Sequence, residues 1–157
     1  DGPSVYHPLY VNAYVQPSAK CVHMLLGMAR RPWADAEYDE ISLLSRWGYI
    51  VAHELAHLSM NSGYALGVEA GLLRDYEPGT PDESMADALA ILSLMHHPTL
   101  NATEDGAAEL CAHLSQSWCA RVPALYEFWP LGSHPRANAR GDSGCKTLAS
   151  AGYVVTP

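Results

Sequence analysis

The sequence has few basic residues and lacks any long apolar run. Lysine and arginine together number 9 against 17 acidic residues, so the formal net charge is −8 with histidine neutral. Binding to nucleic acid or to an anionic membrane surface requires clustered positive charge, and here only Arg30-Arg31 are adjacent. The composition therefore argues against nucleic acid as a partner. No apolar stretch approaches the roughly 20 residues that span a bilayer, so we expect no membrane-spanning segment.

The sequence also lacks a CxxC pair, which argues against a cysteine-based zinc site. An even number of cysteines is compatible with two disulfides, for which three connectivities exist. If residues 103–120 form one helix, Cys111 and Cys119 lie about 12 Å apart along it and cannot bond to each other. The four cysteines are Cys21, Cys111, Cys119 and Cys145.

The cysteines and one glycosylation motif favour an oxidising compartment. Asn101-Ala102-Thr103 is an N-glycosylation sequon. Together these features predict an extracellular or secretory-lumen location. No signal peptide is recognisable and the chain begins at Asp1, so a processed chain or a piece of a longer one is the simplest expectation. Its 157 residues, 48% of them apolar, fit one domain over residues 1–157.

The most informative motif is His53-Glu54-Leu55-Ala56-His57, which has the form HExxH. On a helix, residues four apart lie on the same face, so His53 and His57 can bind one metal ion. Glu54 can then reach a water molecule at that metal. This arrangement is typical of zinc metalloproteases. The alternative interpretation is a buried helix with two hydrogen-bonded core histidines.

Periodicity predicts that this motif lies on an amphipathic helix over residues 37–60, which Asn61-Ser62-Gly63 should end. The apolar residues that recur at steps of three and four are Ile41, Leu44, Trp47, Val51, Leu55 and Leu58.

The remaining elements complete a predicted α+β fold, mostly helical with a small sheet. β-forming residues predict strands at 9–15 and 19–28, the second more buried. A second helix should begin at Pro81, with Thr80 as its N-cap, and end near Leu94. We expect a third helix over 103–120, a loop with one helical turn over 62–79, and an irregular tail over 130–157 with a β-like stretch at 153–155.

A catalytic zinc ion needs a third protein ligand besides two histidines, and Glu83 is the candidate. Asp87, four residues later on the same face, would accept a hydrogen bond from the other ring nitrogen of a ligand histidine and so fix its tautomer. The competing interpretation is a capping box, in which Glu83 folds back onto the Thr80 amide. A glutamate that caps the helix cannot also bind zinc.

Four motifs in the same order resemble the catalytic lobe of the neprilysin and endothelin-converting-enzyme family of zinc endopeptidases, which are gluzincins. They are similar to the family's N-A-Y/F, HExxH, ExxAD and HxPxNxR elements. Gly27, Pro32 and Trp118-Cys119 also fall where the family has such residues. The four motifs are Asn12-Ala13-Tyr14, His53-Glu54-Leu55-Ala56-His57, Glu83-Ser84-Met85-Ala86-Asp87 and His134-Pro135-Arg136-Ala137-Asn138-Ala139-Arg140.

The resemblance implies a zincin-like metalloprotease catalytic domain that hydrolyses peptide bonds with one Zn²⁺ ion. By this resemblance, His53, His57 and Glu83 would bind zinc. Glu54 would be the general base, and Asp87 would orient a ligand histidine.

The resemblance also implies how a peptide or protein substrate is held. His134 would stabilise the oxyanion and Arg140 would bind a substrate carbonyl. Asn12 and Ala13, on an edge strand, would bind the substrate backbone.

The sequence departs from the family in three respects. Met60 stands where the family has an aspartate that supports the second zinc histidine, and the link between His57 and Glu83 is shorter. The large helical lobe that covers the family's active site is missing, so this lobe is a separate chain, or was removed, or the chain is a minimal relative with an open cleft. The departures motivate an alternative, a catalytically inactive structural or interaction subunit. A gluzincin aminopeptidase would need an acidic anchor for the substrate amine, which nothing in the sequence identifies.

Overall fold

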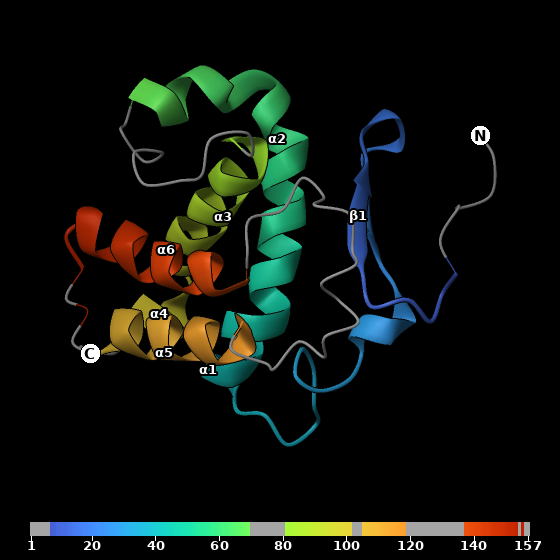
Figure 1. The fold of residues 1–157 in the computed structure, drawn as a ribbon, viewed down its shortest axis with the longest axis horizontal. Helices are drawn as coiled ribbons and strands as arrows, with labels where there is room; N and C mark the ends of the chain where they lie inside the picture. The colour runs from blue at the N-terminus through green and yellow to red at the C-terminus, as the bar shows by residue number, and fades with distance from the viewer. Residues whose placement is uncertain (1–6, 70–80, 102–104, 119–136, 154, 156–157) are drawn as a thin grey trace.

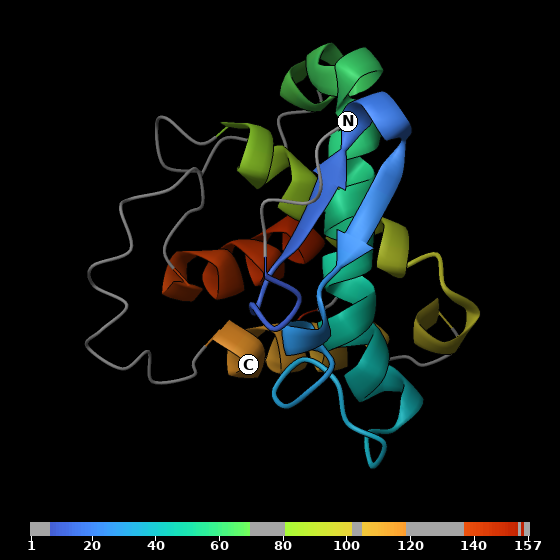
Figure 2. The ribbon, with the colours of Figure 1, turned by 90° about the vertical axis from the view of Figure 1, so that its right-hand side faces the viewer.

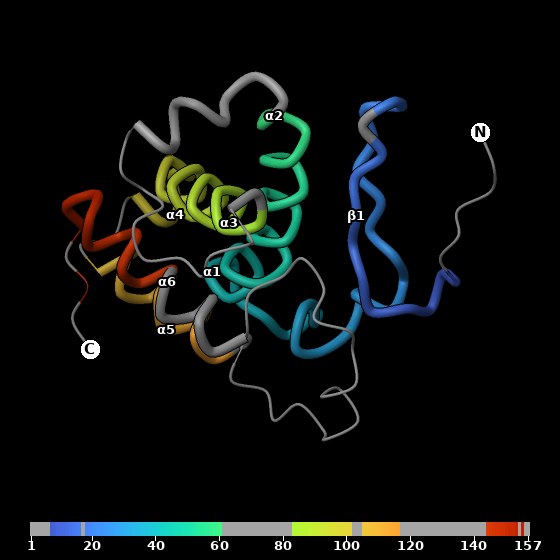
Figure 3. The backbone as a smooth tube through the Cα atoms, turned by 45° about the horizontal axis from the view of Figure 1, so that its top comes forward, coloured from blue at the N-terminus to red at the C-terminus, as the bar shows by residue number. Residues whose placement is uncertain are grey.

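The computed structural model describes residues 7–69, 81–101, 105–118, 137–153 and 155. These residues form an α+β fold that is mostly helical and has one two-stranded antiparallel sheet, as the sequence predicts (Figure 1). The long helix α2 (Tyr49–Glu69) stands between the hairpin on one side and the other helices on the opposite side, which the tube view also shows (Figure 3). Every other element is placed by its contacts with α2 or with the helices packed on it.

The hairpin consists of β1 (Ala13–Gln16) and β2 (Cys21–Met24), joined by a 3₁₀ turn over Pro17–Ala19. Ala13 is opposite Met24 and Gln16 is opposite Cys21. Both strands are shorter than predicted, and the second is half-buried to exposed instead of more buried than the first. Both strands of the hairpin contact α2 and lie along it (Figure 2).

A close backbone approach explains why β2 ends early. At Gly27, in the 3₁₀ turn η2 (Leu26–Met28), an added Cβ would lie 2.2 Å from the Tyr10 carbonyl oxygen and 2.4 Å from that of Leu9. Only glycine fits this position, because backbone atoms cannot yield as a side chain end can. The backbone amide of Gly27 also donates to the Pro8 carbonyl at 3.3 Å, which fixes the lead-in to β1.

The predicted helix over 37–60 exists but is longer and is not uniformly α-helical. It begins with α1 (Glu40–Leu43), capped by the Asp39 carboxylate, which accepts from the Ser42 amide at 2.7 Å. A π-helical segment, η3 (Leu44–Gly48), follows, and α2 then continues to Glu69.

The predicted end of this helix at Asn61-Ser62-Gly63 is wrong, because α2 runs through it. A glycine inside a helix costs about 1 kcal/mol, which the packing of α2 against α3 (Pro81–Leu94) can outweigh. Leu55, assigned to the apolar stripe, is 51% exposed. Polar residues of the HExxH motif take the buried face of the helix instead, as described below.

The second predicted helix is confirmed by α3, which starts at Pro81 and ends at Leu94. The third predicted helix corresponds to α5 (Gly106–Trp118), preceded by the short α4 (Pro98–Asn101). The buried apolar side chains of these helices pack against the start of α2. The largest buried members of this core are Tyr49, Ile91, Leu100, Leu110, Leu114 and Leu148.

The prediction of an irregular tail is wrong, because residues Ala137–Ser150 form helix α6. The glycines that suggested a loop serve packing. An added Cβ at Gly144 would lie 3.1 Å from Ile91 Cδ1 and 3.3 Å from Leu114 Cδ1, so this glycine lets α6 approach α3 and α5 closely. The β-like stretch predicted at 153–155 is not a strand at Tyr153 or Val155, and residue 154 lies outside the described residues.

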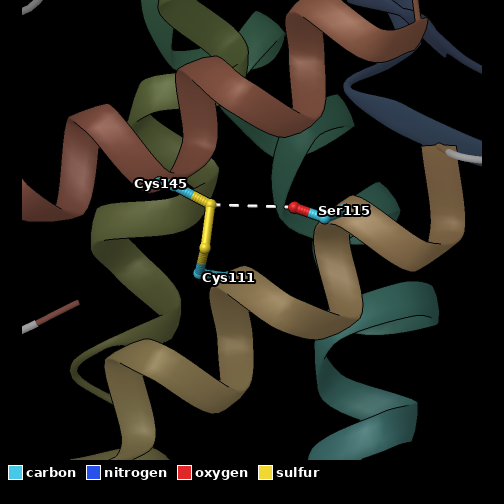
Figure 4. Close-up of a disulfide and its surroundings, with 3 residues drawn as sticks. All are labelled: Cys111, Ser115 and Cys145. Atoms are coloured by element: carbon cyan, nitrogen blue, oxygen red, sulfur yellow. Dashed lines mark hydrogen bonds between the residues drawn. A yellow bond between two sulfur atoms is a disulfide. The ribbon is translucent and has the colours of Figure 1, made fainter. Parts of the chain in front are cut away.

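A disulfide between Cys111 and Cys145 joins α5 to α6, with Cα atoms 5.1 Å apart (Figure 4). The Ser115 hydroxyl lies 3.7 Å from the Cys145 sulfur. Cys111 thus bonds outside its own helix, as its distance from Cys119 predicts. Cys21 is a free, exposed thiol, and Cys119 lies outside the described residues. Within the described part of the chain, no helix has the length and apolar character to cross a membrane.

Candidate metal centre

The interface between α2 and α3 buries polar side chains from both helices. His53 and Glu54 on α2 face inward, with 2% and 7% of their surface exposed. Glu83, in the first turn of α3, is 8% exposed. Carboxylates and imidazoles are rarely buried unless they are paired or bind a metal, so this cluster indicates a site.

Three side chains from the two helices converge on one point. His53 Nε2 lies 3.1 Å from His57 Nε2 and 3.2 Å from Glu83 Oε2. His57 Nε2 lies 3.5 Å from Glu83 Oε1, and the two rings are perpendicular. Among the described residues, His53, His57 and Glu83 are the one group of three whose ligand atoms all lie within 4.8 Å of one another.

These separations fit a tetrahedral metal site. Ligand atoms at 2.0–2.2 Å from a tetrahedral zinc ion are about 3.3–3.6 Å from one another. The three observed separations of 3.1, 3.2 and 3.5 Å lie in that range or within about 0.2 Å of it. Two imidazole nitrogens and a carboxylate are also the donor set of catalytic zinc sites. The residues present therefore fit a zinc ion.

The position of Glu83 bears on the capping-box alternative. Both of its carboxylate oxygens lie near imidazole nitrogens of α2, at 3.2 and 3.5 Å. Thr80, the predicted partner in the cap, lies outside the described residues. A carboxylate that faces α2 in this way is oriented as a ligand requires.

Asp87 lies behind His53 and was expected to contact a ligand histidine. Its Oδ1 is 2.8 Å from His53 Nδ1, so the expected contact is present. With its Nδ1–H donated to Asp87, a neutral His53 presents the lone pair of Nε2 to the centre. Asp87 is one turn after Glu83 on the same face of α3, which is why one helix supplies both groups.

Two buried carboxylates lie on either side of the His53 ring. Asp87 and Glu83 are both buried and face opposite nitrogens of His53. A neutral His53 that donates to Asp87 would turn a lone pair toward the Glu83 carboxylate, which is repulsive. A second proton on His53, a proton on the Glu83 carboxyl or a metal ion between the two groups would remove this repulsion.

Tyr49 is a residue of this site that sequence analysis missed. Its hydroxyl donates a short hydrogen bond to Asp87 Oδ1. The signal that could have found it is the spacing, because Tyr49, His53 and His57 follow each other at four-residue steps on one helix face.

Two of the proposed substrate-binding residues, Asn12 and Ala13, lie at the start of the hairpin, which is on the opposite side of α2 from α3 (Figure 1). Asn12 is half-buried just before β1, and its carbonyl accepts from the Leu25 amide at 3.2 Å. Ala13 is the first residue of β1 and is opposite Met24. Among the described strands β1 pairs only with β2, which makes it an edge strand as predicted.

The structure does not test the roles predicted for His134 and Arg140. His134 lies outside the described residues, and Arg140 is placed on α6 by its backbone only. Met60 is half-buried on α2, one turn after the HExxH motif. No protein-family model, curated protein or solved structure matches the chain. The functional interpretation therefore depends on the chemistry of the site itself.

Proposed function

We propose that this protein is a zinc-dependent peptidase, a zincin-like enzyme that hydrolyses peptide bonds. The observation that carries the proposal is the convergence of His53, His57 and Glu83 within 4.8 Å, two residues from one helix and one from another. The spacing of these atoms suits one Zn²⁺ ion with a fourth position for solvent. The contact of Asp87 with His53 supports the same assignment, because zinc-bound histidines usually donate their other N–H to a carboxylate or carbonyl.

When bound, the zinc ion supplies a Lewis acid that lowers the pKa of a bound water toward about 7. Glu54 is the proposed general base, because it follows His53 directly in the sequence and is buried. It would accept the proton of the attacking water and later pass it to the leaving amine. His134 is proposed to stabilise the oxyanion, and Arg140 to bind a substrate carbonyl.

A peptide or protein substrate would bind by strand addition to β1. Asn12 and Ala13 lie at the start of this edge strand, and its main-chain groups could pair with an extended peptide. Such binding uses hydrogen bonds to the substrate backbone, so it is compatible with many peptide sequences. A separate covering lobe or partner chain would then restrict access to the cleft.

The disulfide between Cys111 and Cys145 supports an extracellular or secretory-lumen location. Disulfides persist in oxidising compartments and are rare in the cytosol. The free thiol of Cys21 does not conflict with this location, because one exposed cysteine can coexist with a structural disulfide.

The substitution Glu54→Gln tests the proposal. It removes the base but keeps the size of the side chain, so we expect peptide hydrolysis to fall by about 10²–10⁴-fold. Zinc content, measured by atomic emission, should stay at one ion per chain. Glu109→Gln, an exposed site on α5, is the matched control and should keep the full rate.

Three results would contradict the proposal. An unchanged rate of peptide hydrolysis in Glu54→Gln would show that Glu54 is not the general base. Stoichiometric zinc without cleavage of any member of a diverse peptide library would favour the catalytically inactive structural or interaction subunit. A chelator should abolish cleavage by the wild-type protein. Continued cleavage would show that the reaction needs no metal.

A further inference from the structure

We propose that Tyr49 is a positioning residue of the metal centre: its hydroxyl holds Asp87, and Asp87 holds His53. The inference rests on the proposed zinc site but not on peptide hydrolysis. It extends the site by one residue along α2 and gives a functional reason for a buried polar group in the core.

One carboxylate oxygen of Asp87 links the other two side chains. Tyr49 Oη donates to Asp87 Oδ1, and the same oxygen accepts from His53 Nδ1 at 2.8 Å. Tyr49 is 2% and Asp87 1% exposed, so water does not compete for these bonds. The rings of Tyr49 and His53 are 6.2 Å apart and tilted, which leaves the carboxylate within reach of both.

Two donors on one oxygen fix the carboxylate more firmly than one donor does. A buried carboxylate accepts several hydrogen bonds, and each bond in a water-free place is stronger than at the surface. With the carboxylate held in place, its contact with Nδ1 orients the His53 ring so that Nε2 faces His57 and Glu83.

The local helix geometry directs Tyr49 to this place. Tyr49 is the first residue of α2 after the π-helical segment η3, and it precedes His53 by four residues. Residues four apart share a helix face, so any rotation of the helix that places His53 in the interface also places Tyr49 there. Single-turn π-helical segments occur often beside functional sites.

The variant Tyr49→Phe tests the inference, because it keeps the ring in the core and removes only the hydroxyl. We expect zinc affinity, measured by competition with a chromogenic chelator, to fall about tenfold, the lower end of the range for groups that support metal ligands. Tyr38→Phe is the matched control. It loses a hydroxyl that donates to the Pro32 carbonyl away from the site and should keep wild-type affinity. An unchanged affinity in Tyr49→Phe would overturn the inference.

A double-mutant cycle with Asp87→Ala separates positioning from a general effect on folding. Asp87→Ala should weaken zinc binding more than Tyr49→Phe does. In the Asp87→Ala background, Tyr49→Phe should have no further effect, because its only route to the metal is gone. Additive losses would show that Tyr49 acts through core packing and would overturn the inference.

If Asp87→Ala does not fold, NMR of the His53 Nδ1 proton in the zinc-loaded protein tests the inference. Tyr49→Phe should shift this resonance and speed its exchange with water, because the acceptor Asp87 is held less firmly. The same resonance and exchange rate in both proteins would overturn the inference.

The outcomes also separate this inference from the proposed function. Zinc binding that depends on Tyr49 in a protein that cleaves no peptide would sustain the inference and contradict the peptidase. A wild-type protein that binds no zinc would overturn both.

Discussion

The α2–α3 interface and the α5–α6 interface of this protein are built on opposite principles. Between α2 and α3 the buried residues include His53, Glu54, Glu83 and Asp87, all of which can carry charge. The described part of the α5–α6 interface buries the leucines Leu110, Leu114 and Leu148 and is reinforced by the disulfide Cys111–Cys145 (Figure 4).

This difference in composition distinguishes side chains that could bind a metal from side chains that stabilise the fold. Burying charged side chains costs several kcal/mol per ion before any pairing, so a polar interface is weak unless something compensates. Apolar contacts and a disulfide carry no such cost. We infer that the α5–α6 region stabilises the fold, whereas the α2–α3 interface depends on the proposed metal ion.

The largest expected effect that sharpens this comparison is the response of stability to zinc. At free zinc a thousand times its Kd, the free energy of unfolding should rise by about 4 kcal/mol. Glu83→Gln should lose most of this gain, because an amide is a much poorer zinc ligand. Urea unfolding with zinc or with chelator measures both values. Equal stability of the wild type in the two conditions would show that the polar interface needs no metal.

The next effect concerns the other interface. Replacing both Cys111 and Cys145 by alanine opens a loop of sequence separation 34, which should lower stability by about 3–4 kcal/mol. Zinc affinity should not change, because no cysteine contacts the described site residues. A parallel loss of zinc affinity would show that the α5–α6 interface and the α2–α3 interface are not independent.

Gly144→Ala tests the packing of α6 with a smaller effect. Helix propensity alone predicts a gain of up to about 1 kcal/mol. The new Cβ would lie 3.1 Å from Ile91 Cδ1, so we expect overpacking to cost about 1–3 kcal/mol and to outweigh this gain. Thermal unfolding distinguishes the two signs. A stabilised variant would mean that the α6 contact is looser than described.

The smallest effect comes from His113, a histidine of α5 outside the candidate site. Burial of its ring lowers its pKa below the ordinary value of 6.5, and the Arg46 guanidinium lowers it further. The unfolded chain then binds the proton more readily, so stability is lost as pH falls below 6.5. Urea unfolding of metal-free protein over this range should show a weaker pH dependence in His113→Gln. Identical pH dependence in the two proteins would contradict the assignment.

The fold class and the start of α3 were predictable because they depend on local rules. A proline at the first helical position fixes where α3 begins, and three-to-four-residue periodicity identified the helix that carries HExxH. Helix α6 was missed because its glycines read locally as loop formers. What favours the helix there is close contact with Ile91 and Leu114, which are distant in sequence.

The spacing of His53 and His57 on one helix, and of Glu83 and Asp87 on another, follows from the order of residues, since helical geometry alone places each pair on one face. That the two pairs face each other depends on how α2 packs against α3, and no local pattern contains that information. The same packing selected Tyr49 as a partner of Asp87 and turned Leu55 outward, because the buried face of α2 is whichever face its neighbours cover.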